Sequence, residues 1–119
     1  MSNTYQIYLI SDSTGETLDR IFLALKAQFS NITYEVHPYS FTRTENQIIK
    51  ILEIAKKKEN SVILYTIVDN NLAKFLANQS EEKGLPCFGV LGNLILSFSK
   101  LLNQKASHEP SGQHVLNEE

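Results

Sequence analysis

One stretch of the chain decides the fold: Tyr5-Gln6-Ile7-Tyr8-Leu9-Ile10-Ser11-Asp12-Ser13-Thr14-Gly15-Glu16-Thr17. Its first six residues are nearly all apolar, which is typical of a strand covered on both faces of a parallel sheet. A short polar segment with one glycine follows, and then apolar residues recur at helical spacing. A buried strand, a tight turn and a helix in this order predict the first unit of an α/β sheet.

Three further runs have the character of strands: residues 32–37, 62–68 and 87–91. The last two are mainly apolar, as expected of strands covered on both faces. Residues 32–37 alternate between apolar and polar side chains, so this strand has one wet face and belongs at an edge. Edge placement favours the parallel, flavodoxin-like order 2-1-3-4. The rival order 3-2-1-4 would bury the polar face of residues 32–37.

Between the strands, apolar residues recur every three or four positions, as on one face of a helix. The four stripes are Leu18-Ile21-Phe22-Leu25-Phe29, Ile48-Ile51-Leu52-Ala55, Leu72-Phe75-Leu76 and Leu94-Phe98-Leu101-Leu102. Thr44 to Gln47 has the form of a capping box, and Gly84 followed by Pro86 ends the third helix. The sequence therefore predicts a four-stranded parallel α/β sheet with helices on both faces.

The length of 119 residues fits one domain. We expect residues 1–105 to form the α/β domain, and residues 106–119, which have no periodicity, to form a connector. The net charge of −2 is not the clustered basic surface that nucleic acid requires. The start has no secretory signal pattern, no apolar run could span a bilayer, and Cys87 is the single cysteine. These features predict a cytoplasmic protein that contacts neither membrane nor nucleic acid.

The loop Ser13-Thr14-Gly15-Glu16-Thr17 is the candidate phosphate site. Open α/β sheets bind ligands outside the carboxyl ends of the strands, at the switch point, which the order 2-1-3-4 places between strands 1 and 3. Gly15 allows a tight turn, and the helix that follows presents N–H groups and a positive dipole end. The hydroxyl groups of Ser13, Thr14 and Thr17 would add donors.

The same loop has a purely structural alternative. Ser13 and Glu16 have the spacing of a capping box, which needs no ligand. The carboxylates of Asp12 and Glu16 would also repel a phosphate in the absence of a cation. Phosphate binding and simple helix capping therefore both remain open at this stage.

Four residues in the strand-end loops are candidates to line the same crevice: Asp12, Arg43, Asp69 and Asn93. Arg43 could pair with a phosphate or carboxylate, or its side chain could lie over Tyr39 or Phe41. Asp69 and Asn93 are also well placed to act only as helix N-caps.

The sequence lacks several signals of catalytic chemistry. The three histidines, His37, His108 and His114, have no metal-ligand spacing with one another or with Cys87, so no metal site is predicted. Neither Gly-x-x-x-x-Gly-Lys-Ser/Thr nor Gly-x-Gly-x-x-Gly occurs. We therefore assign no nucleotide-binding residue in this chain.

Residues Tyr8-Leu9-Ile10-Ser11-Asp12-Ser13-Thr14-Gly15-Glu16-Thr17 resemble the opening signature of a known family, the regulatory proteins of pyruvate, phosphate dikinase and phosphoenolpyruvate synthase. Tyr65-Thr66-Ile67-Val68 resembles the third strand of that family, and residues 108–119 resemble its connector. The resemblance covers essentially the whole chain. It is specific in the first and last stretches.

The resemblance implies a bifunctional kinase and pyrophosphorylase. Such proteins use ADP to phosphorylate a threonine of the dikinase, and use inorganic phosphate to remove that group as pyrophosphate. ADP and inorganic phosphate would be the substrates, and pyruvate, phosphate dikinase or phosphoenolpyruvate synthase the partner. The nucleotide loop of the family, Gly-x-Ser-Arg-x-Ser-Lys-Thr, lies in a C-terminal domain beyond the connector, and this sequence ends before it. We therefore expect the catalytic residues to lie outside this chain. We also expect the chain alone to bind neither substrate and to be inactive.

Other classes of function fit the same pattern. The segment Asp12 to Thr17 is close to the phosphate loop of an FMN-binding flavodoxin, in which Tyr39 or Tyr65 would stack on the flavin. A receiver-like domain would use Asp69, although the acidic pair and the fifth strand of that class are missing. A docking or homodimerisation module would use the apolar edge of the fourth strand around Phe88.

Overall fold

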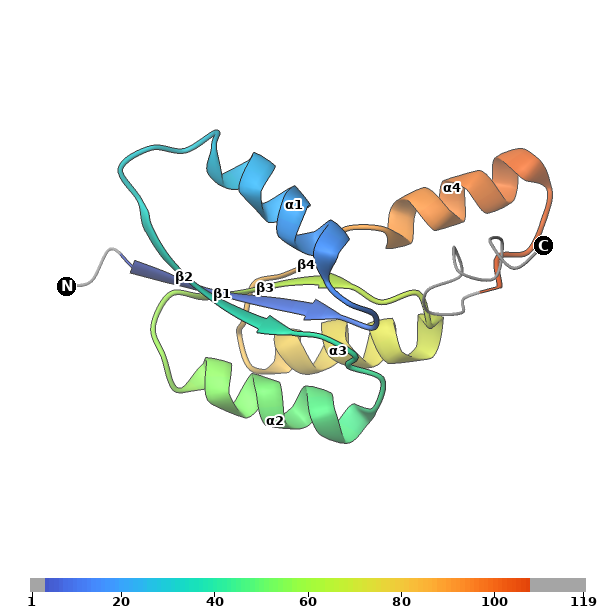
Figure 1. Ribbon diagram of the computed structural model, residues 1–119. Helices are drawn as coiled ribbons and strands as arrows, with labels where there is room; N and C mark the ends of the chain where they lie inside the picture. Colours follow the sequence, from blue (N-terminus) through green and yellow to red (C-terminus); the bar gives the residue numbers. More distant parts are fainter. Residues whose placement is uncertain (1–3, 108–119) are drawn as a thin grey trace.

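The computed structural model describes residues 4–107 (Figure 1). In this part of the chain, strands and helices alternate in the order β1 (Thr4–Ser11), α1 (Glu16–Lys26), β2 (Thr33–Tyr39), α2 (Glu45–Lys56), β3 (Ser61–Thr66), α3 (Asn70–Glu82), β4 (Cys87–Gly89) and α4 (Gly92–Leu102). All pairings between the strands are parallel, and their order is β2-β1-β3-β4. The predicted α/β fold and strand order are confirmed.

Strand β1 lies at the centre of the sheet, where it is paired on both edges. Ile7, for example, is opposite Val36 of β2 and Val62 of β3. The side chains of β1 are buried from Gln6 onward, as expected for an apolar strand covered on both faces. The polar segment after Ser11 therefore emerges at the middle of the carboxyl edge of the sheet.

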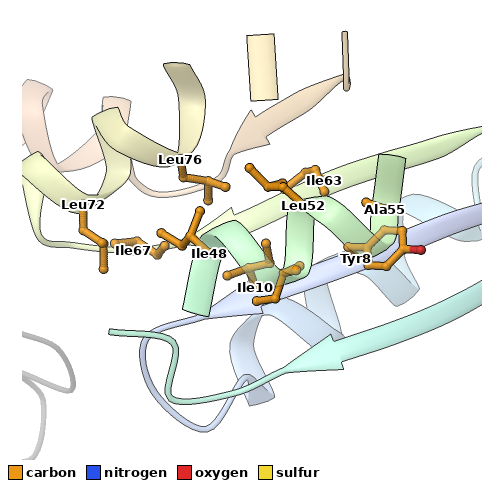
Figure 2. Packing of buried hydrophobic residues seen from close by; sticks show 10 residues of the cluster. Tyr8, Ile10, Ile48, Leu52, Ala55, Ile63, Ile67, Leu72 and Leu76 are labelled. Carbon is orange, nitrogen blue, oxygen red and sulfur yellow. The ribbon is translucent and has the colours of Figure 1, made fainter. Parts of the chain in front are cut away.

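The main core lies between the sheet and the helices α2 and α3. Figure 2 shows Tyr8 and Ile10 of β1 and Ile63 of β3 facing Leu52 of α2 and Leu76 of α3. A smaller cluster on the other face joins the sheet to α1. Helices thus cover both faces, as predicted, with α2 and α3 on one side and α1 on the other (Figure 1).

Two of the predicted apolar stripes are covered less than expected. On α1, Leu18 and Phe22 are buried, but Leu25 is 44% exposed and Phe29, beyond the helix, is 54% exposed. On α4 no residue is buried. The helix lies beyond the carboxyl ends of the strands and does not cross the sheet (Figure 1). The apolar stripe of this helix is therefore not covered by the sheet.

The edge strands are also shorter or more exposed than the sequence suggested. β2 lies at the edge as predicted, but neither of its faces is fully buried. β4 ends at Gly89 although the apolar run continues to Leu91. The ring of Tyr65 packs against Gly89, where an added Cβ would lie 2.7 Å from the ring. Within residues 4–107, no helix is long and apolar enough to cross a bilayer.

Candidate phosphate-binding site

The segment between β1 and α1 is fixed in place by the loop that follows β2. The backbone N–H of Phe41 donates to the carbonyl oxygen of Ser13 over 2.9 Å, and that of Thr42 donates to the carbonyl of Ser11 over 2.8 Å. Parallel pairing brings these two loops together because both begin at the carboxyl end of adjacent strands. The carbonyl groups of the β1–α1 loop are thus occupied by protein donors.

Gly15 is the residue at which this loop turns into α1. Its φ of 89° and ψ of 1° lie in the left-handed region, which glycine adopts without steric cost. Next to it, the hydroxyl group of Ser40 donates to the carbonyl of Thr14 over 2.8 Å. The side chains of Thr14 and Thr17 are exposed. Hydroxyl groups therefore border a turn that only glycine forms easily.

The predicted capping box of Ser13 and Glu16 is wrong. Gly15 is the N-cap of α1, and no side chain accepts a capping hydrogen bond there. The N–H of Ser13 instead donates to the hydroxyl oxygen of Ser11 over 3.1 Å. The N–H of Glu16 makes only a long contact of 3.4 Å with the hydroxyl oxygen of Thr14. The positive end of α1 is therefore not neutralised by a capping side chain.

Asp12 connects the three strand-end loops of the central sheet. Its side chain is only 4% exposed, and its Oδ2 accepts from the N–H of Val68, after β3, over 2.8 Å. Its backbone N–H donates to the carbonyl of Thr66 over 3.2 Å. Its carbonyl oxygen accepts from Nε of Arg43, after β2, over 2.8 Å. The carboxylate thus belongs to the β1–β3 junction.

Burial raises the pKa of Asp12 above its ordinary value of 3.8. The hydrogen bond from Val68 and the charge of Arg43 act in the opposite direction, and the nearby charge of Asp69 adds to the increase. Burial is the largest of these effects, so the surroundings of Asp12 disfavour the charged form of its carboxyl group. Such a group at a strand end is a recognised mark of a functional site, although structural carboxylates share it.

Replacing Asp12 by asparagine is expected to raise the free energy of unfolding at neutral pH. Because the folded-state pKa is raised, the unfolded chain releases this proton more readily, and the wild type loses stability as pH rises above 3.8. Asparagine carries no charge and can still accept from Val68. Urea denaturation of both proteins should show a difference at neutral pH that disappears below pH 3.8. A variant that is less stable than the wild type at neutral pH would contradict a raised pKa of Asp12 in the folded state.

Arg43 and Asp69 both have the structural roles that the sequence left open. The guanidinium carbon of Arg43 lies 5.5 Å from the centre of the Phe41 ring, so this arginine does lie over Phe41. Oδ1 of Asp69 accepts from the N–H of Leu72 over 3.1 Å and caps α3 as predicted. Arg43 remains beside the β1–α1 loop through its bond to Asp12.

Asn93 does not join this cluster. It is not the N-cap of α4, because the helix begins at Gly92 after Leu91, without a side-chain cap. Asn93 lines a cavity of about 340 Å³ between β3, α3 and α4, together with Asn70 and Lys74. The Ser13–Thr17 loop does not line that cavity. The expected convergence of four loops therefore holds for three of them.

The tyrosines considered for flavin stacking are engaged in packing. Tyr39 stacks with Tyr8 at 6.3 Å between ring centres, and Tyr8 stacks with His37 at 4.7 Å. Tyr65 lies against Gly89. Phe88 is 57% exposed and lines an apolar groove of about 270 Å³ on the α1 side of the sheet. Within residues 4–107, no three His, Cys, Asp or Glu side chains are grouped closely enough to hold a metal ion.

Two residues of the site were missed by the sequence pattern. Ser40 and Thr42 hold the β1–α1 loop through a hydroxyl group and a backbone N–H. The turn between them places Phe41 at a φ of 53°, a left-handed conformation that no glycine or asparagine marks at this position. Without a glycine or asparagine at this position, the sequence does not predict the turn.

Comparison with known proteins gives the family. Residues 7–119 match the family model described as kinase/pyrophosphorylase. The chain belongs to the kinase/pyrophosphorylase family. The resemblance found in the opening motif is therefore confirmed.

Relatives of the chain carry the provisional name pyruvate, phosphate dikinase regulatory protein. A protein of Pelagibacter ubique (strain HTCC1062) is 76% identical over 119 residues, which are 100% of this chain and 43% of that protein. Proteins of Brucella anthropi and Brucella ovis are 40% and 38% identical over 113 residues, which are 95% of this chain and 41% and 40% of those proteins. The chain spans about two fifths of the length of these curated relatives.

Proposed function

We propose that this chain is the phosphate-facing part of a protein that regulates pyruvate, phosphate dikinase or phosphoenolpyruvate synthase. The complete protein would phosphorylate a threonine of its target with ADP, and would remove that phosphate with inorganic phosphate to give pyrophosphate. The family match and the names of the relatives support this proposal. A cytoplasmic location fits the single cysteine, Cys87.

Within this activity, the Ser13–Thr17 loop is proposed to hold inorganic phosphate or the phosphothreonine of the target. The observation that carries the proposal is the geometry of Gly15. It turns the chain into α1 at the carboxyl end of the central strand, and no side chain caps the helix. Helix N-termini at this place in open sheets are favourable sites for phosphate.

The carboxylate of Asp12 should repel a bound phosphate less strongly than its position in the sequence suggests. Its carboxylate accepts from Val68, and burial disfavours its charged form. Glu16 is exposed to solvent, so the high dielectric constant of water weakens its repulsion of a nearby anion. Arg43, held beside the loop by its bond to the carbonyl of Asp12, is a candidate to balance the charge of a phosphate.

The direct test is titration of the chain with inorganic phosphate, followed by NMR of the backbone amides. The amides of residues 13–17 are expected to shift in a saturable manner, while those in α2 stay unchanged. A parallel titration with sodium chloride at equal ionic strength controls for screening. Shifts that are absent, or that chloride reproduces, would remove the support for a phosphate site.

The chain by itself is expected to transfer no phosphate. Phosphoryl transfer depends on a phosphate loop, a lysine and usually a metal ion that position and neutralise the phosphates. The sequence has no Gly-x-x-x-x-Gly-Lys-Ser/Thr element. Incubation of the purified chain with ADP and a dikinase should leave the target threonine unmodified, as judged by mass spectrometry. The full-length Pelagibacter relative, assayed in parallel, is expected to modify it.

A second candidate role is homodimerisation through the face around Phe88. The apolar groove that this residue lines is the observation in its favour. Light scattering should then show a dimer that Phe88→Glu converts to a monomer, while Ile54→Glu on α2, with an exposed fraction of 45%, leaves it intact. A monomeric wild type at all concentrations would exclude this role. The FMN alternative shares the strand order, but the family match favours the kinase/pyrophosphorylase assignment.

A further inference from the structure

Helix α4 exposes apolar side chains that nothing in the described part of the chain covers. None of its residues is buried, and Leu94 and Leu101 are 56% and 76% exposed. The helix has 11 residues. A helix this short is only marginally stable in water, and most helices in proteins are stabilised by packing of an apolar face. Helix α4 therefore needs a packing partner outside residues 4–107.

The apolar residues of α4 lie on two sides. Leu94, Phe98 and Leu101 follow the spacing i, i+4, i+7 and form one stripe. Ile95, Leu96 and Ser99 lie on another side and line the cavity of about 340 Å³ that separates α4 from α3. The stripe of Leu94, Phe98 and Leu101, called here the outer stripe, does not line this cavity. It is the surface on which a partner is missing.

The length of the relatives indicates which partner this is. This chain matches only 43% of the Pelagibacter protein, so more than half of that protein lies outside the match. A region attached to the same chain acts at an effective concentration of the order of millimolar for a short linker. A separate second copy would be present at far lower concentration. The attached region is therefore the favoured occupant of an apolar surface on the helix.

We propose that the outer stripe of α4 is the docking surface for the part of the kinase/pyrophosphorylase chain that lies outside the matched region. Figure 1 places α4 at the carboxyl ends of the strands, on the same side of the molecule as the turn into α1. Docking there positions the attached region next to the candidate phosphate site. The inference rests on exposure and chain length, and holds whether or not the Ser13–Thr17 loop binds phosphate.

Hydrogen exchange of the α4 amides tests this inference. Two samples are compared: the chain of 119 residues, and a chimera in which this chain replaces the matched part of the Pelagibacter relative. Exchange in α4 should be slower in the chimera by roughly a hundredfold. The three side chains of the outer stripe are about half exposed or more, and burying the exposed part of each should slow opening by about fivefold. Protection of β1 and β3 in the same samples reports whether the domain is folded.

Two leucines of α4 form a matched pair of variants. Leu94 and Leu96 have the same exposed fraction, 56%, but Leu94 belongs to the outer stripe and Leu96 lines the cavity. Leu94→Glu in the chimera should return α4 exchange to the rate of the short chain. Leu96→Glu should change it by less than about threefold, because its side chain does not meet the docked region.

Three results would overturn the inference. Equal exchange of α4 in the chimera and in the short chain would show that the attached region does not cover the helix. Protection in the short chain that increases with protein concentration would make a second copy the occupant. If Leu96→Glu removes the protection of α4 and Leu94→Glu does not, the attached region docks on the side of α4 that lines the cavity and not on the outer stripe. If β1 and β3 are unprotected, the chimera is not folded. Exchange of the corresponding helix in the intact Pelagibacter relative then replaces the measurement: slow exchange supports docking, and exchange as fast as in the short chain contradicts it.

Discussion

Gly15→Val is expected to abolish phosphate binding by the Ser13–Thr17 loop. Gly15 has a φ of 89°, and a residue with a Cβ pays about 1–2 kcal/mol in the left-handed region, with more for a β-branched side chain. An added Cβ would make an ordinary contact of 3.4 Å with the hydroxyl oxygen of Ser40, so the strain arises from the positive φ. The turn would move, and the N–H groups of α1 would lose their common direction. NMR titration with inorganic phosphate measures this loss.

Gly84→Val is the matched control for this variant. Gly84 has a φ of 70° and follows the end of α3, whereas Gly15 precedes the start of α1. An added Cβ at Gly84 would meet nothing within 4 Å. Both variants carry similar backbone strain, so both should lower the free energy of unfolding by a similar amount. Only Gly15→Val should lose phosphate binding. Equal retention of binding in the two variants would mean that the loop geometry is irrelevant to phosphate.

Leu52→Ala is expected to destabilise the fold more than any surface change. Leu52 is fully buried between α2 and the sheet, in the cluster shown in Figure 2. Removing its branched end leaves a cavity within the buried cluster that includes Tyr8, Ile63 and Leu76, and it also loses apolar burial. The expected decrease in the free energy of unfolding is about 2–5 kcal/mol. Urea denaturation followed by circular dichroism measures it.

Ile54→Ala on the same helix is the control for Leu52→Ala. Ile54 is 45% exposed and does not belong to the buried cluster. Its loss should cost less than about 1 kcal/mol, because much of its surface already contacts water. Similar losses in the two variants would mean that the α2–α3 side of the sheet is not the main source of stability. The smaller cluster between the sheet and α1 would then be the main support of the loops at the candidate site.

Most of the fold could be predicted from the sequence because its signals are local. The apolar run of β1 and the alternating pattern of β2 were enough to place one strand at the centre and the other at the edge. Thr44 and Asp69 were correctly assigned as helix caps, since each directly precedes the helix whose N–H it accepts. In both cases the short-range pattern and the tertiary structure agree.

The departures arise where partners distant in sequence decide the outcome. Ser13 and Glu16 have the spacing of a capping box, but the loop after β2 binds the carbonyl of Ser13 and the chain turns at Gly15 instead. The stripe on α4 is present, but periodicity does not state what a helix faces. The position of Asn93, within the helix, follows from the early end of β4 at Gly89.

Main-chain donors make part of the contact between the β2–α2 loop and the β1–α1 loop, beside the side-chain donors Ser40 and Arg43. The donors at residues 41 and 42 are backbone N–H groups, which every amino acid except proline provides. The side chain at residue 41 can therefore change without removing this donor, although a φ of 53° disfavours β-branched residues. An insertion or deletion between residues 39 and 43 is different in kind, because it would shift both donors out of line at once. We therefore expect the number of residues in this loop to matter more to the two main-chain bonds than the side chains that it carries.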